Sequence, residues 1–468
     1  MIDKLLPVAV IGAGPVGLAA AAQIVSRGLE PVIFERGASV GASLLEWSHV
    51  RVFSPWQYDV DAAARSLLEA AGWDAPEETG LPTGGEIVER YLRPLADLPQ
   101  IAPHLHLGAT VMSITRQGLD KVSNAGRDKA PFEIRWTDVD GNEQATLARA
   151  VIDASGTWTQ PNPIGVDGLP VLGERAVADR VAYGIPDVLG PERSTYAGKT
   201  TLVVGCGHSA INAALALLAL QESVPGTKVL WALRRNRIEK LLGGGLNDQL
   251  PERGALGLAA KKAIDAGRLQ ILAPFAARRL TPTGTGVAVM GTLGQTHITV
   301  MVDRIVVATG FRPDLGILSE LRVAIDPATE APPSLSPLID PNFHSCGTVP
   351  PHGVDELTQP EAGFYIVGSK SYGRAPTFLM ATGYEQVRSV VAELAGDHIA
   401  ARQVHLVLPE TGVCNVSLPG EAASSCCGGP AATASSCCVA DEVAKAEGES
   451  GCGCGTSTNQ TIRVQEPA

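Results

Sequence analysis

Two glycine-rich segments with the same spacing constrain the fold of this chain more than any other feature of its sequence. The first, GAGPVG, occupies residues 12–17, and the second, GCGHSA, occupies residues 205–210. Each follows a short run of β-branched and aliphatic residues and precedes an alanine-rich stretch. A strand, a tight glycine turn and a helix, in this order, form the phosphate-binding unit of dinucleotide-binding α/β folds. The sequence therefore predicts an α/β protein with two Rossmann-like domains, each built on a parallel sheet.

The first segment fits the pattern G-x-G-x-x-G. Gly12 would permit the tight turn, Gly14 would let a pyrophosphate approach the backbone, and Gly17 would allow the helix to pack closely on the strand. Glu35 ends the next predicted strand, where a carboxylate accepts hydrogen bonds from both ribose hydroxyls and repels a 2′-phosphate. The alternative is a chance glycine turn in an unrelated α/β protein. The residues predicted to bind the cofactor here are Gly12, Gly14, Pro15, Gly17, Glu35 and Arg36.

The second segment fits the G-x-G-x-x-A variant of the pattern but has no acidic partner. Arg234 and Arg235 close the next predicted strand instead. Arginine offers bidentate donors to a 2′-phosphate, so this site is predicted to prefer NADPH over NADH; the alternative is that the two arginines are only a solvated strand end. The predicted residues of this site are Gly205, Gly207, His208, Ser209, Arg234 and Arg235.

Two dinucleotide sites in one chain indicate that the two cofactors have different roles. One cofactor can be tightly bound and redox-active while the other delivers hydride, which is the plan of an FAD- and NADPH-dependent oxidoreductase. The first site, with its carboxylate, would hold FAD, and the second would hold NADPH.

The overall charge and the hydrophobic pattern exclude several other classes of protein. With 37 Lys and Arg against 49 Asp and Glu, the formal net charge is −12, which argues against nucleic acid or an anionic membrane as the main partner. No stretch approaches the roughly 20 apolar residues that span a bilayer. The glycine turn at 12–17 interrupts the apolar N-terminal segment where a signal peptide would continue. We therefore expect a cytoplasmic protein.

The order of these segments predicts a discontinuous FAD domain with a second domain inserted into it. We expect the FAD domain to comprise residues 1–165 and 300–400, because strand-like runs resume near residue 300. The NADPH domain would comprise residues 166–299, after a proline-containing connection. Residues 401–468 lose this pattern and contain a stretch rich in Ala, Ser, Gly and Cys, so we expect a flexible, disordered tail.

Two long polar or glycine-rich stretches are expected to be loops. Residues 117–131 separate two strand-like runs, which indicates a β-meander with a long loop. Residues 243–257 are rich in glycine and are expected to form a mobile loop. An exposed edge in the 117–131 hairpin could pair subunits, but the sequence leaves the oligomeric state open.

Residues 6–395 resemble the flavoproteins with two dinucleotide-binding domains, and most closely the flavin-containing monooxygenase-like group. Besides the two glycine segments, the resemblance rests on DASG at 153–156 and ATG at 308–310, which occupy the places of the family's two links between domains. FRPD at 311–314 follows the second link as in the family. FYIVGS at 364–369 is similar to the last FAD segment, with Ser369 where Asp is commoner.

The resemblance implies a set of further contacts with the flavin. Gly156 and Gly310 belong to the two links, Gly368 would lie against the flavin, and Val111 would lie beside the adenine. The helix that contains Gly383, Tyr384 and Gln386 would also face the flavin, and the segment with Trp47, Ser54 and Trp56 would lie near the isoalloxazine unless these side chains only pack the core.

The resemblance also implies a reaction. NADPH would reduce the flavin, and the reduced flavin would react with dioxygen and oxygenate a soft nucleophile. The family's fingerprint F-x-G-x-x-x-H-x-x-x-W/Y is absent, since residues 170–199 contain no histidine. The first nucleotide segment also lacks a nearby C-x-x-C pair, which argues against a disulfide reductase with its cysteines beside the flavin.

The cysteines are concentrated at the C-terminus. Only Cys206 and Cys346 precede residue 400, and seven others fall within 414–454. Thiolates are soft donors, and paired thiols in a flexible tail could bind a trivalent arsenical. The tail is similar to those of several bacterial arsenic-resistance proteins, and flavoproteins of this group resemble members of arsenic-resistance gene clusters. The candidate metalloid ligands are Cys426, Cys427, Cys437, Cys438, Cys452 and Cys454.

Several interpretations of the cysteines remain open at this point. The tail could remain reduced and unliganded, or its thiol pairs could pass electrons in an NADPH-dependent thiol or metal reductase. A non-catalytic protein that sequesters metalloid on a flavin-binding scaffold is a third alternative. Cys346, six residues before His352, is a candidate reactive thiol, or a small buried loop residue. No other catalytic side chain is assigned, because the flavin carries the chemistry.

Overall fold

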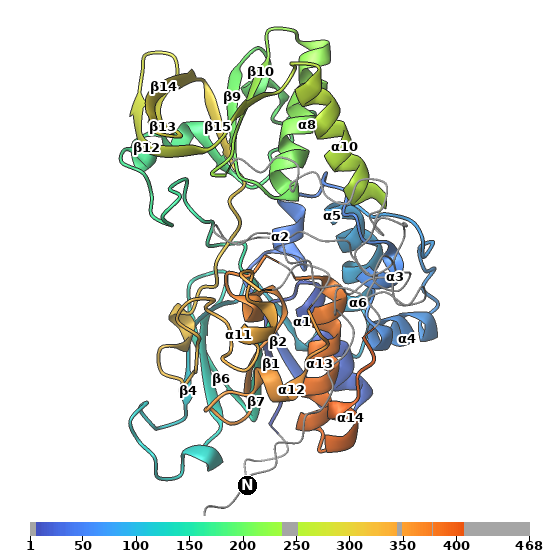
Figure 1. Ribbon diagram of the computed structural model, residues 1–468. Coiled ribbons are helices and arrows are strands. Elements are labelled where there is room, and N and C mark those ends of the chain that lie inside the picture. Colours follow the sequence, from blue (N-terminus) through green and yellow to red (C-terminus); the bar gives the residue numbers. More distant parts are fainter. Residues whose placement is uncertain (1–5, 236–250, 344–348, 377, 407–468) are drawn as a thin grey trace, which may run out of the picture. The chain divides into compact units, whose positions relative to one another are not determined.

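A computed structural model of the chain describes residues 6–235, 251–343, 349–376 and 378–406, with the side chains of 251–254 left out. The chain divides into two compact units, residues 1–416 and 417–468, and all described residues lie in the first. The expected disordered tail therefore lies almost entirely outside the described residues. Figure 1 shows the arrangement of the elements within the first unit.

The first parallel sheet has the strand order β16-β7-β1-β2-β3. Its central strand, β1, pairs in parallel with β7 on one side and β2 on the other. The sheet contains two strands from residues 8–35 and one strand at residues 364–366. A strand from late in the chain thus completes a sheet that begins near the N-terminus. The bounds are β1 Val8–Ile11, β2 Pro31–Glu35, β3 Leu105–Leu107, β7 Ala150–Asp153 and β16 Phe364–Ile366.

Helices α1 and α13 pack against each other beside this sheet (Figure 1). Helix α1 (Pro15–Ser26) is almost wholly apolar and buried along most of its length. Helix α13 (Met380–Leu394) confirms the helix expected to contain Gly383, Tyr384 and Gln386. The shorter helices of the same region complete this core: α2 Ala42–Leu45, α3 Trp56–Asp59, α4 Ala62–Ala70, α5 Gly84–Ile87, α6 Arg93–Ala96, α11 Ser336–Ile339, α12 Val354–Leu357 and α14 His398–Arg402.

The second parallel sheet has the order β11-β10-β9-β15-β8. Together with the first sheet, it confirms the predicted α/β fold with two Rossmann-like units. Helices α8 (His208–Ser223) and α10 (Pro251–Asp265) contact each other and cover a shared hydrophobic core. The strands are β8 Val181–Tyr183, β9 Thr200–Val204, β10 Lys228–Ala232, β11 Gln270–Leu272 and β15 Arg304–Val307.

The prediction of a mobile loop at 243–257 is wrong for the second half of this segment. Residues 236–250 lie outside the described part of the chain, but helix α10 begins at Pro251. Proline fits the first turn of a helix because its fixed φ suits the helix and its missing N–H would have no partner there. Ala260 and Ala263 are buried, so packing against the second sheet outweighs the glycines within the helix.

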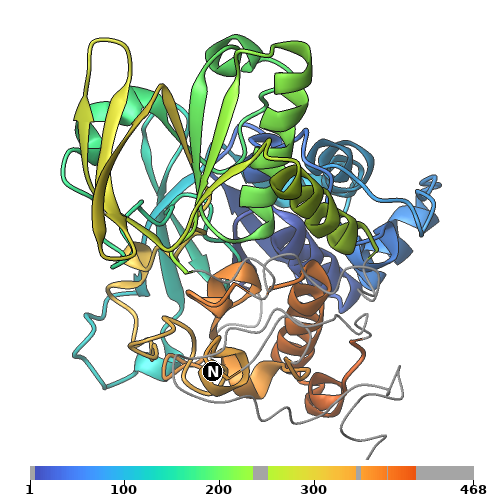
Figure 2. The same ribbon diagram turned by 45° about the horizontal axis from the view of Figure 1, so that its top comes forward.

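Two three-stranded antiparallel sheets accompany the parallel ones (Figure 2). The β4-β5-β6 sheet confirms the meander, and its first two strands flank the predicted 117–131 loop, which contains only a short 3₁₀ turn at Arg127–Lys129. The strands are β4 Thr110–Arg116, β5 Phe132–Thr137 and β6 Glu143–Ala148, and in the other sheet β12 Phe275–Pro282, β13 Val287–Leu293 and β14 Thr296–Val302.

The strand pairing moves one expected domain boundary. The boundary at residues 299–300 falls inside β14, and β15 still pairs with β9 of the second sheet. The second sheet therefore extends to Val307, because the buried run Ile305–Val307 fills the place between β9 and β8. The assignment of each region to one cofactor remains a prediction.

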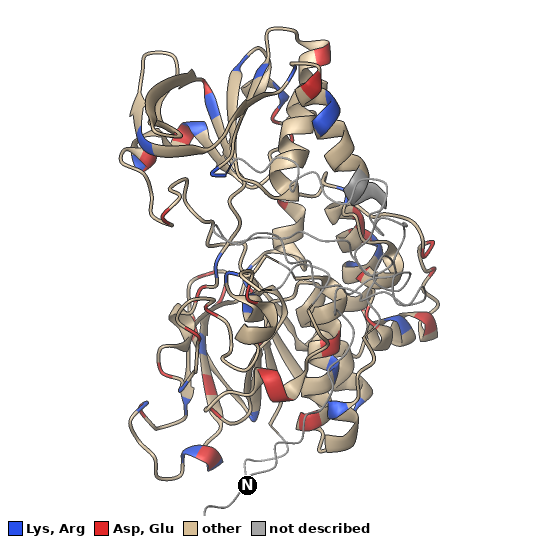
Figure 3. Ribbon diagram, in the orientation of Figure 1, with Lys and Arg blue, Asp and Glu red and all other residues tan. Residues whose placement is uncertain are grey.

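Basic and acidic residues are interspersed over the described elements (Figure 3). Among the described helices, none is both long and apolar enough to cross a membrane. A cytoplasmic location and the exclusion of nucleic acid remain predictions.

A buried charge network anchors the 117–131 loop to the distant segment around residue 361. Glu361 accepts hydrogen bonds from Arg116 Nε at 2.8 Å and from Arg127 Nη2 at 2.7 Å, and all three side chains are buried. The guanidinium of Arg116 also lies 3.7 Å from the centre of the Phe132 ring. Burial raises the pKa of Glu361, but the hydrogen bonds from Arg127, Arg322 and Arg116 outweigh burial and lower the pKa overall.

We expect Glu361→Gln to lower the free energy of unfolding by about 3–5 kcal/mol at neutral pH, because two buried guanidinium groups lose their counter-charge. The contribution of Glu361 is present above the pKa of the unfolded carboxyl and is lost as the pH falls through the lowered folded-state pKa. Urea unfolding from pH 7 downward measures both. Glu133→Gln is the control, because its partner Arg135 is 64% exposed and such a pair contributes at most about 1 kcal/mol. Equal losses in the two variants would contradict this account.

Candidate cofactor-binding site

The first glycine turn, residues 12–17, has the geometry that a bound pyrophosphate requires. Gly12 has φ +98°, and a Cβ there would lie 2.8 Å from the Ala154 carbonyl oxygen. A Cβ at Gly17 would lie 1.9 Å from the Gly12 carbonyl oxygen, so the helix packs directly on the turn. A Cβ at Gly14 would meet nothing within 4 Å. Gly12 and Gly17 therefore lie in close contact with neighbouring backbone, whereas the space beside Gly14 is open. This fits the roles predicted for the three glycines.

The carboxylate of Glu35 lies at this turn. Its Oε2 accepts a hydrogen bond from the Ala13 N–H at 2.8 Å, and its Oε1 accepts one from the Gly37 N–H at 2.7 Å. The structure thus brings Glu35 to the backbone between Gly12 and Gly14, and its contact with a ribose remains a prediction. Arg36 is exposed next to it, and Val111 is half-buried in β4. Their contacts with FAD remain predictions.

The second glycine turn, residues 205–210, repeats this arrangement. Gly205 has φ +141°, and a Cβ there would lie 2.2 Å from the Ala308 carbonyl oxygen, whereas a Cβ at Gly207 would meet nothing within 4 Å. The Trp231 indole N–H donates to the Gly205 carbonyl at 2.8 Å and fixes the turn to β10. The open face of this turn fits a second dinucleotide.

The other predicted residues of the second site lie around this turn. Arg234 and Arg235 are exposed just after β10, Ser209 is exposed, and His208 is the first residue of α8. The His208 ring lies 5.2 Å from the ring of Phe53, which comes from the first region of the chain.

The two links identified by resemblance lie side by side. Asn162, after the first link, donates from Nδ2 to the Thr309 carbonyl at 3.2 Å and accepts at Oδ1 from Arg312 Nε at 2.9 Å. Thr309 Oγ1 donates back to the Asn162 carbonyl at 2.7 Å. Both link glycines, Gly156 and Gly310, have positive φ, +70° and +87°, so the chain turns sharply in each link.

A buried ion pair at the first link was missed by the sequence reasoning. Lys370 Nζ lies 2.7 Å from Asp153 Oδ2 and donates to Ser155 Oγ at 3.0 Å, and the Lys370 and Asp153 side chains are almost fully buried. It holds the last predicted FAD segment against the first link, where a Cβ at Gly156 would lie 3.6 Å from Ser369 Oγ. The only sequence signal was a lysine inside the motif FYIVGSKSY.

The N-terminal end of α13 meets the start of α1, and the contact of this helix with the flavin remains a prediction. A Cβ at Gly383 would lie 2.5 Å from Val16 Cγ2, and one at Gly368 would lie 3.4 Å from the same side chain. The Gly368 N–H donates to Gln386 Oε1 at 2.7 Å. Gly368, Gly383 and Gln386 therefore gather beside the first glycine turn.

The aromatic segment divides into core and partly exposed residues. Trp56 is 3% exposed and belongs to the main hydrophobic core, so for this side chain core packing is the better description. Trp47 is half-buried and its ring lies 6.4 Å from Trp158. Trp158 in turn stacks on Phe311 at 4.5 Å, next to the two links.

The cysteine predictions lie almost wholly beyond the described residues. Cys346 and all the candidate metalloid ligands of the tail are outside them. Cys206 is described, and it is exposed within the second glycine turn. In the described part of the chain, no group of three or more His, Cys, Asp or Glu side chains could hold a metal ion.

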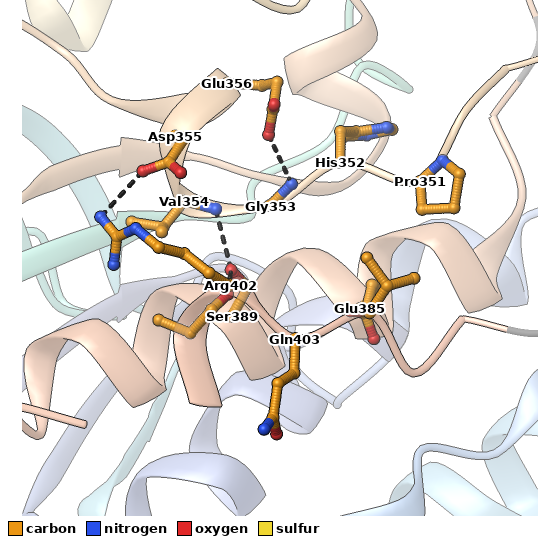
Figure 4. A pocket seen from close by; sticks show the side chains of 12 residues that line it. Pro351, His352, Gly353, Val354, Asp355, Glu356, Glu385, Ser389, Arg402 and Gln403 are labelled. Atoms are coloured by element: carbon orange, nitrogen blue, oxygen red, sulfur yellow. Dashed lines mark hydrogen bonds and ion pairs between the residues drawn. The ribbon is translucent and has the colours of Figure 1, made fainter. Parts of the chain in front are cut away.

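A surface cavity is present on another face of α13 (Figure 4). It lies between α12, α13 and α14, where the Val354 N–H donates to Ser389 Oγ at 2.8 Å and Arg402 pairs with Asp355 at 2.9 Å. These polar groups are paired with one another, so we assign the cavity to the packing of α14 on α13.

We expect Gly17→Ala and Gly14→Ala to separate folding from cofactor binding. The alanine at 17 would overlap the Gly12 carbonyl and lower the free energy of unfolding by about 1–3 kcal/mol. The alanine at 14 would enter open space and leave stability nearly unchanged while weakening FAD binding. Urea unfolding of the cofactor-free proteins and titration of flavin fluorescence measure the two effects. A stable Gly17→Ala protein, or unchanged FAD affinity in Gly14→Ala, would contradict the assignment.

We expect the double variant Arg234→Ala/Arg235→Ala to bind NADPH at least about 10-fold more weakly, because it loses charge-assisted hydrogen bonds to the 2′-phosphate. Binding of NADH should stay the same, since NADH has no such phosphate. Both arginines are exposed, so folding should be unaffected. Calorimetric titration with each nucleotide makes the comparison, and Arg268→Ala, which removes an exposed arginine paired with Glu222, is the control. An equal loss of affinity for NADPH and for NADH would mean that the two arginines do not bind the 2′-phosphate.

Comparison with known proteins agrees with this geometry. Residues 9–337 match the model of the pyridine nucleotide-disulphide oxidoreductase family. Over 236 residues the chain is 25% identical to the human protein named dimethylaniline monooxygenase (N-oxide-forming) 6, a match that covers 49% of this chain and 41% of the relative. The matched part of this chain thus spans less than half the length of that relative.

Solved structures share the fold at low identity. The bacillithiol disulfide reductase of Bacillus cereus aligns with 84% of this chain and 99% of its own at a TM-score of 0.61 and 19% identity. The FAD-bound cadaverine monooxygenase of Erwinia amylovora aligns with 90% and 100% at a TM-score of 0.60 and 12% identity. The predicted class, an FAD- and NADPH-dependent oxidoreductase, is confirmed by the family match. With both glycine turns, both links and more than half of its length matched, the chain belongs to the pyridine nucleotide-disulphide oxidoreductase family.

Proposed function

We propose that this protein is an NADPH-dependent flavin monooxygenase that transfers one oxygen atom of O₂ to a soft nucleophile, with trivalent arsenicals as the substrate class to test first. The observation that carries the proposal is the pair of open glycine turns, one with a carboxylate at its edge and one followed by two arginines. The partial match to an N-oxide-forming monooxygenase supports oxygen transfer to a nucleophilic atom.

The residues of the chain would mainly bind, orient and shield. Bound FAD would supply hydride acceptance from NADPH and electron transfer to dioxygen. The turn at Gly14 would hold the FAD pyrophosphate and Glu35 its ribose, while Arg234 and Arg235 would select NADPH. The buried Lys370–Asp153 pair would keep the last FAD segment in place.

The C-terminal cysteines are the reason for proposing an arsenical as the substrate. Their pairs are suited to a thiophilic metalloid, but they lie outside the described residues. The tail would then collect the arsenical that the flavin oxidises. The rival, an NADPH-dependent thiol or metal reductase that uses the C-terminal cysteine pairs, needs a thiol beside the flavin to receive the electrons or the ion. Within the described residues, Cys206 is the one cysteine present, and it lies at the second turn rather than the first.

The test is the stoichiometry of turnover with arsenite. The balanced reaction is NADPH + H⁺ + O₂ + As(III) → NADP⁺ + H₂O + As(V) oxyanion, so we expect one O₂ consumed and one arsenate formed for each NADPH. An electrode for O₂, absorbance of NADPH and arsenic speciation give the three numbers. NADPH oxidation without O₂, accompanied by new thiols from a disulfide substrate, would favour the reductase instead.

Truncation after residue 406 separates the tail from the catalytic unit. If the tail collects substrate, the truncated protein should keep its kcat and show a raised KM for arsenite. Unchanged kinetics would remove the tail from the proposal, and loss of all NADPH oxidation would show that the tail is needed by the catalytic unit itself.

A further inference from the structure

A buried carboxyl group lies at the end of α3, which packs against α13. Asp59 is 1% exposed, and its Oδ1 accepts a hydrogen bond from Ser54 Oγ at 2.7 Å. Its Oδ2 is buried and has no hydrogen-bond partner within the described structure. Burial raises the pKa of Asp59 to about 8, although the hydrogen bond from Ser54 lowers it. The side chain therefore holds a proton at neutral pH.

A second buried carboxyl, that of Asp61, has a structural role and serves as a comparison. Asp61 caps α4 by accepting at Oδ1 from the Ala63 and Ala64 N–H groups, both at 2.9 Å. Its Oδ2 accepts from Gln23 Nε2 at 3.2 Å. Both oxygens of Asp61 are thus used, whereas one oxygen of Asp59 is left over. A buried polar atom without a hydrogen-bond partner destabilises the folded state.

The segment from Phe53 to Asp59 contacts the second glycine turn at one end and α13 at the other. At one end, the Phe53 ring contacts the His208 ring at 5.2 Å, at the start of the second fingerprint helix, α8. At the other end, the Asp59 carbonyl accepts from Tyr384 Oη at 2.7 Å. Tyr384 follows Gly383, where α13 touches Val16 of α1. Ser54, the neighbour of Phe53 in the chain, is half-exposed and Asp59 is buried, so of the two side chains that of Ser54 reaches the surface.

We propose that Asp59 is a proton donor for the reaction between the two cofactor sites and acts through the Ser54 hydroxyl. For this step the Ser54 hydroxyl turns from donating to Asp59 Oδ1 to accepting from the protonated carboxyl across the same 2.7 Å contact. The O–H bond of the Asp59 carboxylic acid then breaks as its proton passes to Ser54 Oγ, whose own proton moves to the reacting centre. This proton is the one that the oxygenation consumes on the way to water. The resulting carboxylate is reprotonated from solvent before the next turnover, so no further reductant or oxidant is needed. This inference rests on the proposed function.

The charges around Asp59 are consistent with a neutral resting state. Asp61 is a second buried acid two residues away, and the hydroxyls of Tyr91 and Tyr384 hydrogen-bond to the backbone of Asp61 and Asp59, with pKa values raised mainly by burial. Arg90 lies 5.9 Å from the Trp56 ring, and Arg65 acts on Tyr91. In the described structure no cation bonds to Asp59, and the hydrogen bond from Ser54 is the interaction that favours its carboxylate.

The test compares the holoproteins Asp59→Asn, Ser54→Ala and Asp61→Asn with the wild type. In the wild type, we expect the yield of oxygenated product per NADPH to fall as the pH rises through about 8, where Asp59 loses its proton. In Asp59→Asn the yield should be lower by about 100-fold and no longer show this inflection, since a positioned acid contributes about 10²–10⁴-fold. Ser54→Ala should lower the yield as well, and Asp61→Asn should keep the wild-type profile.

A second readout does not depend on turnover. The infrared band of a protonated carboxyl group, obtained as wild type minus Asp59→Asn, should disappear only near pH 8. The stability of Asp59→Asn should exceed that of the wild type increasingly as the pH rises from 4 to 8, by about 1.4 kcal/mol per pH unit, because burial of an ionisable carboxyl favours its protonated form. An asparagine does not carry this penalty. Both measurements also show whether the Asp59→Asn protein is folded.

The outcomes separate this inference from the proposed function. A wild type that takes up no O₂ overturns both. A wild type that oxygenates its substrate, with Asp59→Asn showing the same yield and the same pH profile, overturns the proton-donor role alone. A protonated-carboxyl band that vanishes near the ordinary aspartate pKa also overturns it, since Asp59 would then be ionised at neutral pH.

Discussion

The close contact between the fingerprint helix and the glycine turn is the constraint on which the first cofactor site depends. A side chain at Gly17 would overlap the Gly12 carbonyl, and one at Gly12 would overlap the first link at Ala154. Because both positions lack a Cβ, α1 can start directly at the edge of the sheet with its free N–H groups facing open space at Gly14. This is the arrangement in which a helix N-terminus binds a phosphate. The second turn repeats it, with Gly205 against Ala308 of the second link.

The same contacts explain why the chain crosses between the two sheets where it does. Each glycine turn touches the link that follows a neighbouring strand, so each link borders one of the two predicted phosphate sites, and the links are also hydrogen-bonded to each other through Asn162 and Thr309. Lys370 and Asp153 add a buried ion pair at the first link. Such a pair is expensive to break, because either partner alone would be an uncompensated buried charge. The geometry of the sites is therefore fixed by segments far apart in the sequence.

Asp59 and Asp61 show how two identical residues can serve different purposes. They lie two positions apart and both are buried, yet Asp61 uses its oxygens to cap α4 and Asp59 leaves one oxygen without a partner in the described structure. Burial raises the pKa of both carboxyls, to about 8 for Asp59 and about 6 for Asp61. The difference follows from hydrogen bonding, since three backbone N–H groups and Gln23 favour the charged form of Asp61.

The sequence by itself determined the local units of this protein. The glycine spacing, Glu35 and the apolar runs are short-range signals, and they sufficed for the two parallel sheets, their first strands and helices and the cofactor-binding turns. The sequence did not predict helix α10 from Pro251, because its register depends on packing Ala260 and Ala263 against the second sheet. It also could not place β15 in that sheet, since strand pairing is decided between segments about 100 residues apart. Only the tertiary structure brought Lys370 to Asp153 and Tyr384 to Asp59, because burial and hydrogen-bond partners of a charged side chain are set by neighbours that the local sequence does not contain.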